Sequence, residues 1–256
     1  MTPPIMTVVA VPEAPPADMM SSAKSLRAPN WLLKTAMAAT GTALAVMLVI
    51  RLVVNLWFFT GQQHYDAVAG RIANVFTPYV PAGTWLWIIR VAALLLIAAH
   101  VAIGVVLMLR SKAGRGPVRA QLHGGLHAWL TRLMPYTGAV ILVFAIIYVL
   151  DQVFNKLVYP VVISTPPNAP DFGPFAFWNL TNSLQHPAIA IIYIIGLLAI
   201  AAHVLHGLDT VATIAAGGGQ WASQMKKYLV WGGGAVVGAL LLASLLIPLF
   251  VLGGWR

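Results

Sequence analysis

The stretch PAIAIIYIIGLLAIAAHVLHGL, residues 187–208, is the most informative part of this sequence. It is a continuous apolar run of the length that crosses a bilayer, ~20 residues, and it ends with His203 and His206. Because nothing solvates an imidazole inside a bilayer, His203 needs a partner. A second apolar run, residues 82–108, contains His100 at a similar distance from its basic end. Two imidazoles that face each other at one depth can hold a haem iron.

The composition is typical of a polytopic membrane protein. Hydrophobic residues make up 60% of the chain and charged residues 8%, and the mean hydropathy is +0.85. The chain has no cysteine, which excludes disulfides, iron–sulfur ligation and covalent haem attachment within it. Any haem must therefore be bound non-covalently, and any iron–sulfur cluster must belong to a partner.

Five apolar runs are long enough to cross a bilayer, which predicts an all-α membrane protein with five transmembrane helices. The predicted helices span residues 31–59, 82–108, 133–157, 184–208 and 228–252. Residues 1–30 are rich in proline and contain no apolar segment, so we expect a disordered cytoplasmic tail before a five-helix domain of residues 31–256.

Lysine and arginine are concentrated on one side of these predicted spans, as on the cytoplasmic side of membrane proteins. With the N-terminus inside, the inner flanks carry Lys24, Arg27, Lys34, Arg110, Lys112, Arg115, Arg119, Arg132, Lys226 and Lys227, and the outer flanks carry Arg71, Lys156 and Arg256. The formal charge of +9 therefore reflects membrane topology. It gives no reason to expect nucleic acid as a partner.

An internal repeat relates the first two predicted helices to the next two. Met37-x-x-Thr40-Gly41 recurs 97 residues later as Met134-x-x-Thr137-Gly138, and Arg51 and Tyr148 keep the same offset. His100 and His203 repeat loosely, with an offset of 103 residues. The predicted fold is thus a four-helix bundle built from two repeated pairs, plus a fifth helix.

Depth along the helices places the histidines and the glycines in one layer. At ~1.5 Å per residue, His100 lies ~13 Å and His203 ~9 Å from the inner ends of their helices. Gly41 and Gly138 fall in the same layer, where small residues let a flat macrocycle approach the backbone. We therefore predict a haem held by His100 and His203. The alternative is that each histidine hydrogen-bonds a carbonyl of a neighbouring helix and that the Thr-Gly pairs are helix-packing positions.

The remaining histidines are weaker candidates. His206 faces roughly the same side as His203 and is an alternative ligand, but a contact to a haem propionate or to a quinone, or a capping interaction, is favoured. His123 and His127 have metal-compatible spacing but no third ligand nearby. His64 and His186 lie in or beside the outer loops, and we assign them no role.

The order and spacing of several motifs resemble a known family. They are Thr40-Gly41, then Arg51 and Asn55-Leu56; Arg90 before His100; Thr137-Gly138, then Tyr148 and Asp151; His203 followed by Gly207-Leu208; and Ile247-Pro248-Leu249 followed by Gly253. The chain resembles the five-helix cytochrome b membrane-anchor subunit of bacterial succinate dehydrogenase and fumarate reductase (succinate:quinone oxidoreductase).

This resemblance implies an anchor in the bacterial inner membrane that holds an iron–sulfur subunit and a flavoprotein subunit on the cytoplasmic face, with possible association of whole complexes. Electrons would pass between the partner's clusters and a membrane quinone, while FAD and the flavin catalysis stay in the partner chains. In two-haem members the inner haem takes histidines that correspond to His100 and His203. The outer haem takes positions that are Arg51 and Tyr148 here, so the resemblance implies one haem b.

We place the quinone at the inner ends of the helices, where donors and acids are available: Trp31, Lys34, Arg132, Tyr136, His206 and Asp209. In the lost outer site we expect Tyr148 or Asp151 to accompany Arg51, and bulky neighbours such as Trp57 to fill the space. Three other functions remain as alternatives: a haem-free anchor, a cytochrome b of another quinone-linked oxidoreductase, and, least favoured, a transporter.

Overall fold

The computed structural model describes residues 28–114, 126–154, 157, 176–216 and 220–254. The predicted tail, except for its last residues, and His123 lie outside them. Within these ranges the structure contains helices and no strands, and five helices are long and apolar enough to cross a membrane. The chain is thus a multi-pass membrane protein, as the composition predicts.

The spanning helices are α2 (Asn30–Leu56), α4 (Thr84–Ala113), α5 (Leu126–Tyr148), α7 (Pro187–Ala216) and α8 (Gln220–Leu252). The 3₁₀ turn η1 (Trp57–Thr60) continues α2, and the π-helical turn η2 (Val149–Val153) continues α5. Most ends extend beyond the predicted apolar runs, because a helix continues into polar sequence once its apolar part is within the bilayer. The exceptions are the starts of the second and fourth predicted helices, which lie at Thr84 and Pro187, and the end of the third, which with η2 lies at Val153.

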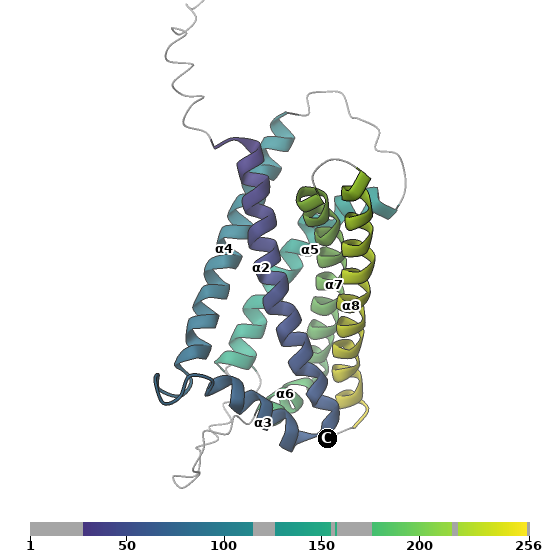
Figure 1. Cartoon of the computed structure of the whole chain (residues 1–256). Coiled ribbons are helices and arrows are strands. Elements are labelled where there is room, and N and C mark those ends of the chain that lie inside the picture. Colours follow the sequence, from purple (N-terminus) through teal and green to yellow (C-terminus); the bar gives the residue numbers. More distant parts are fainter. Residues whose placement is uncertain (1–27, 115–125, 155–156, 158–175, 217–219, 255–256) are drawn as a thin grey trace, which may run out of the picture.

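Two short helices close one end of the bundle. Helices α3 (Gln62–Ala73) and α6 (Ala176–Leu184) lie across the lower end in Figure 1, and the upper end is where α2 begins. Asp66 Oδ1 on α3 accepts the backbone N–H of Phe177 at 2.9 Å, which ties α3 to the first turn of α6. These outer segments are therefore part of the packed structure.

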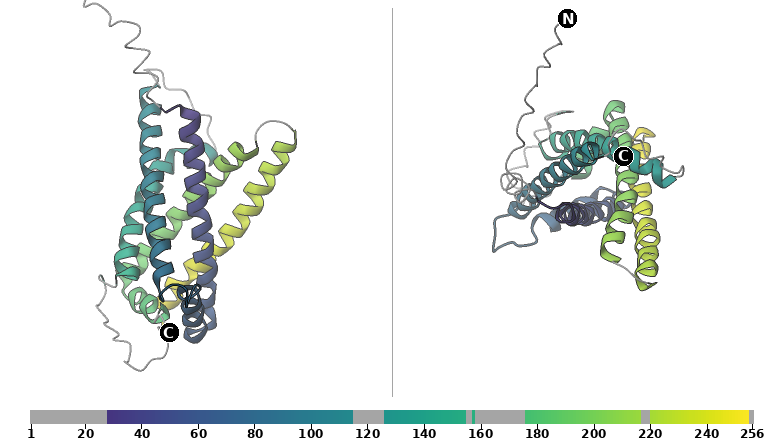
Figure 2. Two further views of the ribbon diagram at one scale, coloured as in Figure 1. Left: turned by 60° about the vertical axis from the view of Figure 1, so that its left-hand side comes forward. Right: turned by 90° about the horizontal axis from the view of Figure 1, so that it is seen from above.

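The spanning helices pack as two pairs and an added helix. Helix α2 packs along α4, α5 packs along α7, and α8 packs mainly along α7. The turned view in Figure 2 shows α7 and α8 inclined to α2 and α4, so that the pairs diverge toward the upper end. The two packed pairs are the same pairs that the internal repeat relates.

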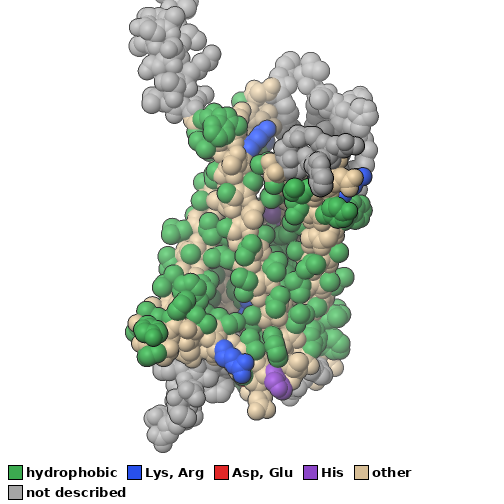
Figure 3. Space-filling view, in the orientation of Figure 1, with side chains coloured by type: hydrophobic (Ala, Val, Ile, Leu, Met, Phe, Trp, Pro, Cys, Tyr) green, Lys and Arg blue, Asp and Glu red, His purple; other side chains and the backbone are tan. Residues whose placement is uncertain are grey.

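The surface is that of a protein surrounded by lipid. Hydrophobic side chains cover most of the visible face in Figure 3, whereas lysine and arginine lie mainly toward the two ends. The spanning parts of α4 and α5 contain no fully buried residue. In a bilayer, apolar side chains on these helices face lipid.

Candidate functional site

The two intramembrane histidines come together between the helix pairs. His100 projects from α4 and His203 from α7, and their ring centres lie 6.4 Å apart with the ring planes inclined by 66°. Each helix packs on the other member of its own pair, so the imidazoles meet across the junction between the pairs. The sequence-based depth match is therefore reflected in a direct approach of the two rings.

Each histidine is held by a threonine on the partner helix of its pair. The Nδ1 atom of His100 lies 3.0 Å from Thr40 Oγ1, and that of His203 lies 3.1 Å from Thr137 Oγ1. The same ring nitrogen is engaged in both cases, which leaves Nε2 as the remaining nitrogen of each ring. The alternative reading, a histidine bonded only to a neighbouring carbonyl, does not describe these contacts fully.

The glycines that follow these threonines lie against the imidazoles. A Cβ added to Gly41 would lie 3.1 Å from Cε1 of His100, and one added to Gly138 would lie 3.4 Å from Cε1 of His203. A larger residue at Gly41 would have to displace the ring. We call the set of Thr40, Gly41 and His100, with the equivalent Thr137, Gly138 and His203, the histidine layer.

The histidine layer fits the axial ligation of a haem iron. Because an imidazole nitrogen binds a metal at ~2 Å, two imidazoles on opposite sides of one ion have ring centres about 6 Å apart, close to the observed 6.4 Å. The donor set is two neutral imidazoles of the kind that bind haem iron. Among the described residues no third histidine or acidic side chain joins them to form a conventional metal site.

Ten residues further toward the lower end, the repeat positions carry large polar side chains instead. Arg51 on α2 and Arg90 on α4 belong to the first repeat, and Tyr148 and Tyr193 occupy the corresponding positions of the second. We call these four residues the arginine–tyrosine layer. Its second tyrosine was not selected from the sequence, although the offset of 103 residues that relates the histidines also relates it to Arg90.

The hydrogen-bond partner of Arg51 was not predicted from the sequence. Its Nη2 donates to the hydroxyl of Tyr65 at 3.2 Å, and Tyr65 comes from α3 at the lower end. Tyr148 and Tyr193 lie near Arg51, whose Nε has no hydrogen-bond partner among the described residues. Within the described part of the chain, neither a hydrogen bond nor a cation–π contact joins Tyr148 to Arg51, and Asp151 forms no ion pair with this arginine.

Asp151 is satisfied by hydroxyl and amide donors. The carboxylate is 2% exposed and accepts hydrogen bonds from Ser183 at 2.8 Å, Tyr193 at 2.9 Å and Gln152 at 2.8 Å. A buried carboxylate needs several such donors to stay in an apolar surrounding. It also lies on the π-helical turn η2, a distortion often found where a helix presents a polar group.

Aromatic rings fill the space around this layer. Phe58 and Tyr65 are fully buried, and Phe58 stacks on Phe177 of α6 with ring centres 4.9 Å apart. The expectation that Trp57 fills the space is wrong, because Trp57 is 42% exposed and its neighbour Phe58 points inward instead. Both residues lie in the 3₁₀ turn η1, where a one-residue step rotates a side chain by about 120°, so the two side chains cannot face the same direction.

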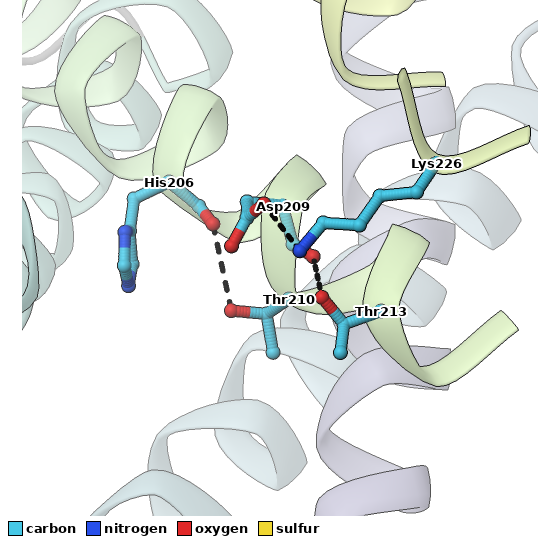
Figure 4. Close-up of polar contacts among 5 residues, drawn as sticks. All are labelled: His206, Asp209, Thr210, Thr213 and Lys226. Carbon is cyan, nitrogen blue, oxygen red and sulfur yellow. Dashed lines mark hydrogen bonds and ion pairs between the residues drawn. The ribbon is translucent and has the colours of Figure 1, made fainter. Parts of the chain in front are cut away.

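The residues chosen for a quinone site differ in exposure and come from three helices, α2, α5 and α7. Trp31 and Tyr136 are 68% and 70% exposed, and Lys34 and Arg132 are exposed as well. His206 is buried, and Asp209 on the next turn of α7 forms an ion pair with Lys226 of α8 at 3.0 Å. Figure 4 shows His206 and the Asp209–Lys226 ion pair. The hydroxyl groups of Thr210 and Thr213 beside them donate hydrogen bonds to backbone carbonyls of α7.

The remaining sequence candidates make contacts other than those of the histidine layer. His64 Nδ1 contacts the carbonyl of Thr60 at 3.1 Å at an exposed position. Arg90 places its guanidinium 4.9 Å from the ring centre of Trp87, a cation–π contact. The structure says nothing of the side chain of His127.

No family model, no curated protein and no solved structure matches this chain.

Proposed function

We propose that this chain is the membrane-anchor cytochrome b subunit of a bacterial succinate dehydrogenase or fumarate reductase. The approach of His100 and His203, with Nδ1 of each tied to a threonine, is the observation that carries the haem part of the proposal. The motif order described above supports the choice of this enzyme class. The protein would lie in the cell's inner membrane with the upper end toward the cytoplasm, where Arg110, Lys112 and Lys226 lie.

In this proposal His100 and His203 are the axial ligands of one haem b. When bound, the haem supplies an iron that accepts and releases single electrons. The chain would hold the two imidazoles at the required separation, and its apolar helices would exclude water. The small residues Gly41 and Gly138 would let the haem macrocycle approach the backbone. The lower layer offers no second ligand pair, because Arg51 has no lone pair to donate.

The upper end is the proposed place of quinone reduction or quinol oxidation. His206 is buried three residues beyond His203, and the Asp209–Lys226 ion pair lies on the next turn. A quinone changes its protonation when it is reduced, so a group that donates hydrogen bonds and a group that exchanges protons are both needed. His206 and Asp209 are suited to these roles. Trp31, Lys34, Arg132 and Tyr136 remain predicted quinone contacts.

The partners follow from the same proposal. An iron–sulfur subunit and a flavoprotein subunit would dock on the upper end, and the dicarboxylate chemistry would take place on their flavin. The chain itself would contribute no catalytic residue to that step. Whole complexes could associate further in the membrane.

One purification tests the main points. The tagged chain should be extracted with its partners in mild detergent, and the haem-to-protein ratio measured by pyridine haemochrome should be close to one. Addition of succinate should reduce that haem in the visible spectrum. A ratio near zero would favour the haem-free anchor, a ratio near two would contradict the single site, and haem that succinate leaves oxidised would favour another quinone-linked oxidoreductase.

A further inference from the structure

We propose that Thr40 and Thr137 are positioning residues whose hydroxyl groups fix the tautomers of His100 and His203 and thereby set the reduction potential of the haem. The inference rests on the proposed function, because it concerns the same site. It assigns a role to the two threonines of the repeat.

The argument begins with the single hydrogen of a hydroxyl group. Thr40 Oγ1 lies 2.9 Å from the carbonyl oxygen of Ala36 and 3.1 Å from that of Met37, and both can only accept. The hydroxyl therefore donates its hydrogen to its own helix and offers a lone pair outward. The imidazole at 3.0 Å must then be the donor, so Nδ1 of His100 carries the hydrogen. The lone pair that a metal requires is then left on Nε2 of His100.

The same arrangement is built twice from different helices. Thr137 Oγ1 lies 3.2 Å from the carbonyl of Leu133 and 3.1 Å from that of Met134, and 3.1 Å from Nδ1 of His203. A histidine that needed only to be satisfied could use either nitrogen. Both histidines engage Nδ1, so Nε2 is the ring nitrogen that each of them leaves for a central ion.

Glycine completes the seat for each ring. The edge of His100 that carries Cε1 lies against Gly41, and the equivalent edge of His203 lies against Gly138. Thr40–Gly41 and Thr137–Gly138 thus restrict both the hydrogen bonding and the rotation of the imidazoles. We call these dipeptides the Thr-Gly seats.

The seats affect the electronic properties of the ligands. An imidazole whose Nδ1–H donates a hydrogen bond is a more basic ligand, and outer-shell partners of this kind typically contribute 10–100-fold to metal affinity. A more basic ligand favours the oxidised iron, so the hydrogen bond lowers the reduction potential. Loss of a seat hydroxyl should therefore raise the potential.

The test compares Thr40→Val and Thr137→Val with Thr40→Ser and Thr137→Ser in the intact complex. Valine keeps the volume and the branching but removes the hydroxyl, whereas serine keeps the hydroxyl. Redox titration followed by visible absorbance should show a more positive potential for both valine variants and a near wild-type value for both serine variants. The affinity for haem, measured by its transfer to a competing apo-protein, should fall by ~10–100-fold in the valine variants.

Thr181→Val is the matched control. Thr181 bonds the carbonyls of Phe177 and Trp178 at 2.9 and 3.1 Å, as Thr40 bonds its own helix, but the structure shows no hydrogen bond from it to a histidine. The reduction potential of the haem in the Thr181→Val variant should equal that of the wild type. A shift as large as that of the seat variants would overturn the proposal, because it would reflect a general effect of losing a buried hydroxyl.

Other outcomes separate this inference from the proposed function. Wild-type protein that holds haem, with valine variants of unchanged potential, would overturn the role of the threonines and leave the proposed function intact. Wild-type protein without haem would overturn both. If the valine variants do not fold, nitrogen-15 NMR of histidine-labelled, haem-depleted wild-type protein decides. Protonated Nδ1 and bare Nε2 in both histidines support the tautomer assignment, and the opposite tautomer in either overturns it.

Discussion

The histidine layer and the arginine–tyrosine layer are each built from both repeats and lie ten residues apart along the same four helices, yet they differ in chemistry. In the upper layer, Gly41 and Gly138 leave room beside two imidazoles that face each other. In the lower layer, ten residues further along the same two helices, the glycines are replaced by Arg51 and Tyr148, whose long side chains fill the space between the helices.

The comparison shows how one helical frame can serve two purposes. Small residues and imidazoles with a remaining nitrogen make a layer suited to a flat ligand. Large aromatic rings pack the other layer, and the carboxylate of Asp151 beside it accepts hydrogen bonds from three neighbouring side chains. Substitutions that act on one layer should therefore change haem content, and substitutions in the other should change stability.

The largest expected effect is complete loss of haem from the upper layer. His100→Ala or His203→Ala should abolish haem binding, because axial ligation by two imidazoles needs both. Pyridine haemochrome of the purified complex measures this. His206→Ala serves as control and should retain haem; haem that survives the loss of His203 but not of His206 would show that the ligand assignment is wrong.

The next effect should fall on the stability of the lower layer. Asp151→Ala removes the acceptor of two buried hydroxyl donors, Ser183 and Tyr193, and of the half-buried Gln152 amide, and each orphaned buried donor costs about 1–3 kcal/mol. The midpoint of unfolding in detergent should fall markedly while the haem ratio at low temperature stays unchanged. Gln152→Ala, which removes one donor and leaves the carboxylate bonded to Ser183 and Tyr193, should lower the midpoint much less.

A smaller loss is expected where α7 touches the aromatic cluster. A Cβ on Gly196 would overlap the ring of Phe144, so Gly196→Ala should cost about 1–3 kcal/mol through overpacking. Gly238→Ala on α8 is the matched control, because a Cβ there meets no atom within 4 Å. Because alanine has a higher helix propensity than glycine, Gly238→Ala should raise the free energy of unfolding slightly. Equal behaviour of the two variants would contradict the tight packing of Phe144.

The smallest effect concerns Asp66, which joins α3 to α6 outside the spanning segments. Burial raises the pKa of its carboxyl, and hydrogen bonds from the backbone N–H groups of Phe177 and Ala176 and from Gln62 offset part of that rise. The folded protein therefore keeps this proton to a higher pH than the unfolded chain does. The free energy of unfolding should fall as pH rises from about 3.9 through the folded pKa.

Asp66→Asn tests this prediction. Its side-chain oxygen can still accept the N–H of Phe177, but it carries no charge. The melting temperature of the variant should therefore change less than that of the wild type across this pH interval. A steeper decline in the variant would show that the carboxylate form is the stabilising one.

Much of the fold and part of the site could be predicted from the sequence. The five apolar runs gave the five spanning helices, because a bilayer requires helices of a minimum length with few charges. Depth along the helices placed Gly41 and Gly138 in the layer of the two histidines, because a regular helix converts sequence spacing into depth. The structure then sets Gly41 against His100 and Gly138 against His203. The haem, the quinone and the partner subunits stay predictions.

Partners that come from outside the spanning helices could not be predicted. Tyr65 on α3 accepts a hydrogen bond from Arg51, and Ser183 on α6 donates one to Asp151. The sequences of these two short helices contain no functional motif. Spacing along one helix carries no information about a segment that folds back over its end.

The sequence by itself thus determined the class, the number of spans and the depth of each polar residue, because hydropathy and helical rise are local properties. The tertiary structure decided which way each residue points. On helices that are apolar on nearly every side, no polar face marks the direction of the core, and packing chose Phe58 over Trp57 for the interior. It also decided that Arg51 bonds Tyr65 and that Asp151 bonds Ser183, Tyr193 and Gln152, because buried polar groups take whichever partners the fold brings within reach.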